Sequence, residues 1–115
     1  MASAQRSATE YLRNNWKDLV TGMKNLPLII ESLYQEGAFN VYDVDALKAE
    51  RTEFDKARSI LDWVINKGDE ASYKLLKILD VTKKTTLDPG LHPWISYFPF
   101  KEEDTDPTMV TGVAL

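Results

Sequence analysis

The sequence predicts an all-α domain built from five or six short helices. Apolar residues recur at spacings of three and four along most of the chain, which is the period of a helix with one buried face. Capping residues and glycines divide these stretches into separate helices, whose short connections favour antiparallel or steeply angled packing. No stretch alternates with period two between hairpin signals, and no segment repeats at a fixed spacing, so neither a β fold nor a repeat array is expected.

The first helix is expected over about residues 9–23. Ser7 and Glu10 form an S-x-x-E capping box at its start. Gly22 is where the sequence favours a bend, because glycine tolerates backbone angles that other residues avoid. The apolar stripe of this helix comprises Ala8, Tyr11, Leu12, Trp16, Leu19, Val20 and Met23.

The second helix is short and strongly apolar, and the third is short and polar. Asn25 is expected to cap the second helix, with Pro27 in its first turn and Gly37 at its end. Its buried face comprises Leu28, Ile29, Ile30, Leu33 and Tyr34. In the third helix, Asn40 and Asp43 repeat the cap-plus-acid spacing, and the apolar anchors are Val44 and Leu47.

The fourth helix carries the clearest signals. Thr52 and Asp55 have the T-x-x-D spacing at its start, and Gly68 supplies a stop at its end. The residues between them follow helical spacing, and the stripe comprises Phe54, Ala57, Ile60, Leu61, Val64 and Ile65.

Two further helices are expected after Gly68. Asp69 is predicted to cap the fifth helix, whose stripe comprises Ala71, Leu75, Leu76, Ile78 and Leu79. A polar stretch, residues 82–86, then separates this helix from a sixth that begins at Asp88 and Pro89. The sixth helix would dock through Leu91, Trp94, Ile95, Tyr97 and Phe98.

One domain accounts for the chain of 115 residues. We expect a flexible N-terminus over residues 1–6, a helical domain over residues 7–98, and an acidic flexible tail or linker over residues 99–115. The N-terminus lacks the apolar region of a targeting segment, and no apolar run is long enough to cross a bilayer. These features predict a cytoplasmic protein that does not contact membranes.

The overall charge argues against a nucleic-acid partner. The chain has 14 basic and 18 acidic residues, a formal charge of -4, and no cysteine. Binding to DNA or RNA normally needs a basic excess to neutralise phosphates, so it is not expected here. The absence of cysteine excludes a disulfide scaffold, thiolate catalysis and thiolate metal sites.

The catalytic and metal-binding patterns that we sought are missing. His92 has no serine and aspartate at triad spacing, and Asp43 with Asp45 lacks the glycine and terminal glutamate of a calcium loop. The glycines are isolated, so they cannot form a phosphate-binding loop. We therefore expect no enzyme, no cofactor and no metal. Trp63 is displaced from its helical stripe, and it is either exposed to a partner or packed at an edge of the core.

The charges are segregated along the chain. Residues 1–25 have a basic excess, residues 26–50 an acidic excess, and residues 88–115 a further acidic excess. The candidate basic side comprises Arg13, Lys17, Arg51, Lys56 and Arg58, and the candidate acidic side comprises Glu31, Glu36, Asp43 and Asp45. A plain solvated surface explains either set, but the division also suits a head-to-tail contact between unlike faces of successive copies.

A series of short motifs resembles the caspase recruitment domain (CARD) of the death-fold superfamily. The motifs are S-L-Y-Q-E-G (32–37), A-E-R-T (49–52), D-K-A-R-S-I-L-D (55–62), N-K-G-D-E-A (66–71) and L-L-K-I-L (75–79). Their order and spacing over the middle of the chain carry the resemblance. The stretch G-L-H-P-W (90–94) is similar to the end of CARDs from NOD-like receptors and their kinase partner. The resemblance covers about residues 7–97.

The resemblance implies a fold, a function and a set of site residues. The fold is a six-helix antiparallel bundle in Greek-key order, with a first helix that is often bent. The function is homotypic binding to other CARD-containing proteins, whether adaptor, caspase, kinase or receptor, together with self-association in apoptotic or inflammatory signalling. Basic residues on helices one and four would meet acids on helices two and three, which by position are the basic and acidic sides given above.

Three roles are consistent with the sequence. The domain is an activating assembly module at the front of a signalling protein, or a stand-alone decoy that caps a partner's assembly without extending it. The third is a helical regulatory subunit unrelated to the death fold, because all-α patterns are compatible with many functions.

Overall fold

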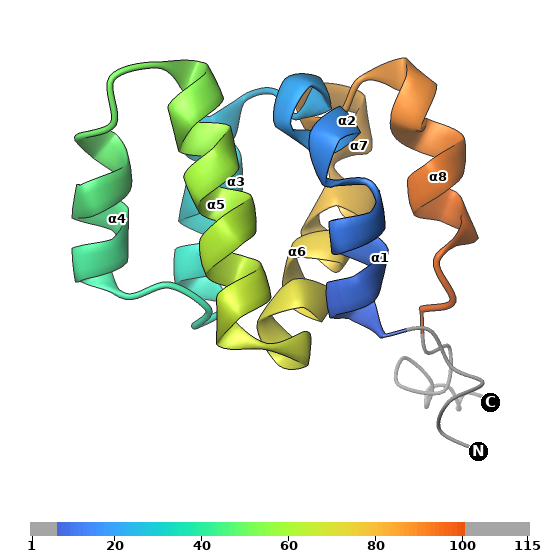
Figure 1. The fold of residues 1–115 in the computed structure, drawn as a ribbon, viewed down its shortest axis with the longest axis horizontal. Coiled ribbons are helices and arrows are strands. Elements are labelled where there is room, and N and C mark those ends of the chain that lie inside the picture. Colours follow the sequence, from blue (N-terminus) through green and yellow to red (C-terminus); the bar gives the residue numbers. More distant parts are fainter. Residues whose placement is uncertain (1–6, 101–115) are drawn as a thin grey trace, which may run out of the picture.

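The computed structural model describes residues 7–100, and within this range the chain forms a bundle of helices (Figure 1). The elements are α1 (Ala8–Asn14), α2 (Trp16–Gly22), α3 (Leu26–Gln35), α4 (Val41–Lys48), α5 (Glu53–Lys67), α6 (Asp69–Val81), α7 (Lys83–Thr86), the 3-10 helix η2 (Pro89–Leu91) and α8 (His92–Tyr97). The predicted all-α death fold is confirmed, with α1 and α2 together in the place of the first helix. Residues 1–6 and 101–115, where an N-terminal segment and most of the acidic tail were expected, lie outside the described range.

The first helix is broken at Asn15, so the predicted bend at Gly22 is wrong. Asn15 has φ -121° and ψ 23°, and its N–H donates to the carbonyl oxygen of Leu12 in a tight turn. Asparagine favours such breaks because its side chain competes for backbone hydrogen bonds. Gly22 has a packing role instead, since a Cβ atom there would lie 2.5 Å from Cδ1 of Leu91.

Helix α6 is the centre of the core. It packs against α1, α3, α5 and α8, and Figure 1 shows it behind the gap between α5 and α1. The large side chains with essentially no exposed surface come from most elements of the bundle, and they are Leu12, Leu19, Ile29, Leu33, Leu47, Ile60, Leu61, Leu75, Leu76, Leu79, Leu87 and Ile95. The predicted stripes therefore converge on one hydrophobic core.

Three residues assigned to buried faces by periodicity are exposed. Tyr34 is 46% exposed, Phe54 is 52% exposed and Tyr97 is 81% exposed. Each lies in the first or last turn of its helix, at the end of a stripe whose middle is covered. Helical spacing identifies the side of a helix that faces the core, but it does not say how far along the helix the neighbouring elements reach.

The predicted caps are confirmed in part. Asn40 and Asp43 form a complete capping box, with both backbone-to-side-chain distances at 2.9 Å. Asp69 is not a cap, because Gly68, with φ 116°, both ends α5 and precedes α6. With one residue between these helices, Asp69 falls in the first turn of α6, where its carboxylate accepts a hydrogen bond from the N–H of Thr9 at 2.9 Å.

Two other expectations about helix ends are corrected. Asn25 makes no side-chain cap at α3 and adopts a left-handed conformation with φ 50°. The polar stretch 82–86 contains the short helix α7 where a separator was predicted. The hydroxyls of Thr82 and Thr86 lie 2.9 Å apart, and Thr86 is buried, so polar side chains within this turn satisfy one another.

Helix α8 closes the bundle against α1 through aromatic contacts. Tyr11 stacks on Trp94 with ring centroids 4.8 Å apart, contacts Phe98 at 4.9 Å, and donates its O–H to the carbonyl oxygen of Trp94. Phe100 then packs on Tyr73 of α6 at 5.8 Å. Core packing thus continues two residues beyond the boundary expected at residue 98.

Replacing Leu61 by alanine should lower the free energy of unfolding by about 2 to 5 kcal/mol, because the side chain is fully buried and its removal leaves a cavity. Chemical denaturation measures this change. The matched control is Phe54→Ala in the same helix, where the exposed ring should contribute far less. Similar losses for both variants would contradict the assignment of the core.

Replacing Asn40 by alanine should cost about 0.5 to 2 kcal/mol of stability, because the N–H of Asp43 loses its acceptor. The control is Asn40→Ser, which keeps an oxygen that can accept the same hydrogen bond. Equal melting temperatures for the alanine and serine variants would show that this cap does not stabilise α4.

Candidate protein-interaction faces

The basic face comprises Arg13, Lys17, Arg51, Lys56 and Arg58. Arg13 lies on α1, Lys17 on α2, Arg51 just before α5, and the other two on α5. Both α1 and α2 pack against α5, so the fold brings these helices together although they are far apart in the sequence. Arg13, Lys17 and Arg51 are exposed and form no ion pair with any residue between 7 and 100.

Lys56 and Arg58 are restrained by acids on their own helix. The ammonium of Lys56 lies 3.8 Å from the carboxylate of Glu53, and the guanidinium of Arg58 lies 3.4 Å from that of Asp55. In each pair at least one partner is largely exposed, and surface pairs of this kind contribute little, typically about 0.2 to 1 kcal/mol. A partner's carboxylate can therefore replace the internal one at small cost.

The acidic face comprises Glu31, Glu36, Asp43 and Asp45 on α3, at its end, and on α4, two helices that pack against each other. Glu31, Glu36 and Asp45 are exposed. Asp43 differs, because its carboxylate caps Asn40 and lies 3.3 Å from the ammonium of Lys67, and its side chain is 22% exposed. Its charge is already compensated within the chain, so the open carboxylates belong to the other three residues.

Trp63 packs at the edge of the core, which is the second of the two interpretations considered above. It is partly buried, and its ring meets that of Phe39 edge-on with centroids 6.3 Å apart. Phe39 is 3% exposed although it lies in the loop between α3 and α4, where helical periodicity gives no signal. The ammonium of Lys67 lies 5.9 Å from the centre of the Phe39 ring.

Two contacts beside these faces could not be found from the sequence. One is the pair between Lys67 and Asp43 described above. The other joins the indole N–H of Trp16 to the carboxylate of Asp62 at 2.9 Å, although the sequence places Trp16 on a buried stripe. These residues are far apart in the chain, and no local motif links them.

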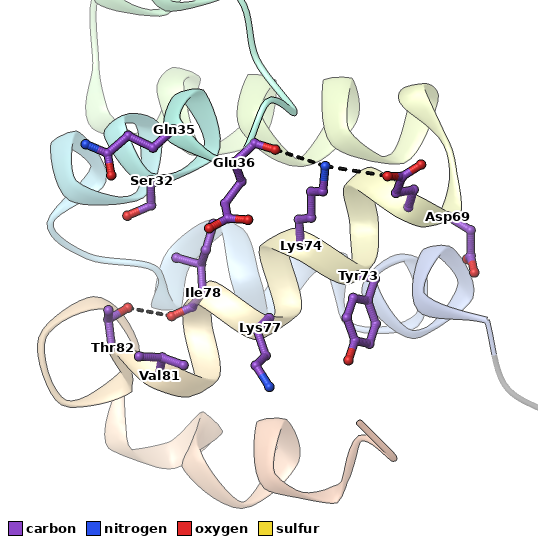
Figure 2. Close-up of a pocket in the computed structure, with 11 residues that line it drawn as sticks. Ser32, Gln35, Glu36, Asp69, Tyr73, Lys74, Lys77, Ile78, Val81 and Thr82 are labelled. Carbon is purple, nitrogen blue, oxygen red and sulfur yellow. Dashed lines mark hydrogen bonds and ion pairs between the residues drawn. The ribbon is translucent and has the colours of Figure 1, made fainter. Parts of the chain in front are cut away.

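A groove between the end of α3 and one side of α6 was also missed (Figure 2). It encloses about 880 Å³. Figure 2 shows the side chain of Lys74 extending from α6 toward Glu36. Its ammonium lies 2.9 Å from the carbonyl oxygen of Glu36 and 3.6 Å from the carboxylate of Glu70. Apolar surface comes from Tyr73 and from Val81, which is 70% exposed.

The described part of the chain offers no constellation for metal chemistry. Between residues 7 and 100, no group of three or more histidine, aspartate or glutamate residues is placed to hold a metal ion. The Nε2 atom of His92 lies 3.0 Å from the carbonyl oxygens of both Lys83 and Leu87, so it holds the turn around α7. No helix in this range is long and apolar enough to span a bilayer.

Comparison with known proteins agrees with this architecture. The family model described as "Caspase recruitment domain" matches residues 9–91. A curated relative, nucleotide-binding oligomerization domain-containing protein 1 of Homo sapiens, is 33% identical over 86 residues, which are 75% of this chain but 9% of that protein. No solved structure matches the chain. The chain belongs to the caspase recruitment domain family, whose members are protein–protein interaction modules in signalling.

Proposed function

We propose that this domain recruits other CARD-containing proteins through a head-to-tail contact between its basic face and the acidic face of a neighbour. The observation that carries the proposal is the set of open charges on separate helices. Arg13 and Lys17 form no ion pair within residues 7–100. Glu31 and Asp45 present exposed carboxylates on α3, which lies behind α5 in Figure 1, and on α4, which lies on the side of α5 away from α1 and α2. Opposite signs on different surfaces suit a heterologous contact that can repeat.

A single contact of this kind is weak. Each exposed ion pair is worth about 0.2 to 1 kcal/mol, and salt screens it. Repetition compensates, because a clustered partner presents several copies and raises the effective concentration for each newcomer. The domain would therefore respond to the clustering of its partners, and a helical oligomer is the form that repeated contacts would take.

The partners that suit this mechanism are CARDs of adaptors, caspases, kinases or receptors, in apoptotic or inflammatory signalling in the cytoplasm. A protease or kinase carried on a partner chain would be activated by proximity. Similarity to a protein of the nucleotide-binding oligomerization type supports an innate-immune setting.

Charge reversal on either face should abolish self-association and leave the fold intact. In Arg58→Glu the basic face repels a neighbour's acids, and in Glu31→Arg the acidic face repels its basic residues. An equimolar mixture of these two variants should form a one-to-one complex, because each chain keeps the face that the other has lost. Sedimentation velocity measures the association state of each variant alone and of their mixture. Far-UV circular dichroism checks that the helices are intact.

The matched control is Lys84→Glu, which reverses an exposed charge on α7 that belongs to neither face. It should self-associate like the unaltered chain, and raising the salt concentration should weaken association in both. Unchanged sedimentation of the face variants, or a mixture that stays monomeric, would contradict the proposed contact.

A further inference from the structure

The basic face is assembled from helices that are held in place by different neighbours. Arg13 lies on α1, which packs chiefly against α6. Lys17 lies on α2, which packs chiefly against α5, the helix of Arg58. Because the helix is interrupted at Asn15, the direction of α1 does not determine that of α2. The place of Lys17 relative to Arg58 therefore depends on how α2 lies on α5.

Besides the buried side chains of Leu19 and Val20, one polar side-chain contact joins α2 to α5. The indole N–H of Trp16 donates to the carboxylate of Asp62 at 2.9 Å. Trp16 immediately precedes Lys17 in the chain, and Asp62 lies four residues after Arg58, which places both on the same side of α5. The rest of the Trp16 ring is partly buried against the core. The hydrogen bond thus joins the residue before Lys17 to the residue one helical turn after Arg58.

The same hydrogen bond explains why an acidic residue, Asp62, is compatible with the basic face. Asp62 is exposed and is spaced to pair with Arg58, yet Arg58 lies against Asp55, at 3.4 Å, and Asp62 lies against the indole. A hydrogen bond to an ionised acceptor is about twice as strong as one between neutral groups. Asp62 is therefore occupied within the chain, and it does not compete with a partner's carboxylates for Arg58.

We propose that Trp16 and Asp62 are positioning residues of the basic face. Their hydrogen bond fixes the start of α2 against α5, so that Lys17 and Arg58 are presented to a partner in a defined arrangement. This role rests on the proposed function, and it adds to that function two residues that lie outside the charged pairs themselves.

The test uses the two charge-reversed chains as a defined pair. In the Glu31→Arg chain the basic face is intact, and the Arg58→Glu chain supplies the acidic face, so calorimetric titration gives one dissociation constant. Asp62→Asn and Asp62→Ala are then made in the Glu31→Arg chain. Both remove the charge, but only asparagine keeps an oxygen that accepts from Trp16. We expect the alanine variant to bind about 3-fold more weakly than the asparagine variant.

A second measurement separates positioning from a general structural effect. Lys17→Glu should weaken binding about 5-fold when Asp62 is unaltered or is asparagine, and less than about 2-fold when it is alanine. Trp16→Phe, which keeps the apolar ring and loses the donor, should behave like Asp62→Ala. Hydrogen exchange of the Trp16 indole proton, followed by NMR, should be slow with Asp62→Asn and fast with Asp62→Ala.

Two results would overturn the positioning role. One is equal binding by the alanine and asparagine variants, and the other is an undiminished effect of Lys17→Glu in the alanine and Trp16→Phe chains. Because Asp62 is exposed and buried Leu19 and Val20 keep α2 on the core, its variants should keep the helices and lose little thermal stability relative to the parent chain. If the parent pair itself fails to bind, the contact between charged faces is wrong and the positioning role falls with it. If the parent pair binds but the Asp62 variants bind equally well, only the positioning role is wrong.

Discussion

The structure depends on the burial of α6. Leu75, Leu76 and Leu79 have no exposed surface, and the helix that carries them contacts α1, α3, α5 and α8. Since hydrophobic burial is the main favourable term in folding, these neighbours are oriented by the shape of one shared helix. Arg13, Arg58 and Glu31 lie on helices that pack directly on α6. Lys17 and Asp45 lie on α2 and α4, which pack on α5. The spacing between the basic and acidic faces is therefore a property of the core.

The charged side chains divide into those that form contacts within the fold and those that are available to partners. Asp43, Asp69 and Asp62 each accept a hydrogen bond from within the chain, so their charges serve helix caps and helix–helix contacts. Arg13 and Lys17 form no ion pair between residues 7 and 100. A count of acids and bases cannot make this distinction, because it depends on which groups the fold places within hydrogen-bonding distance.

The sequence predicted the helices well, but it predicted less well which residues neighbouring elements cover and which distant residues meet. Helical spacing identified the buried middle of each stripe, and the cap at Asn40 was recognised because its partner lies three residues away. Tyr34 and Phe54 were misassigned because the extent of coverage depends on neighbouring elements. The members of both charged faces came from charge segregation and family resemblance. Internal partners from distant parts of the chain, such as Lys67 for Asp43, required the three-dimensional fold, since no local pattern encodes such contacts.

The described chain enters and leaves the bundle at adjacent residues of α6. The hydroxyl of Thr9 lies 3.1 Å from that of Ser72, and the ring of Phe100 packs on Tyr73. Both ends of the bundle therefore share one corner, as Figure 1 shows. In a repeating assembly, whatever is attached before residue 7 or after residue 100 would radiate from the same corner of every copy. Fluorescent tags joined at either end would consequently report the same spacing between neighbouring copies.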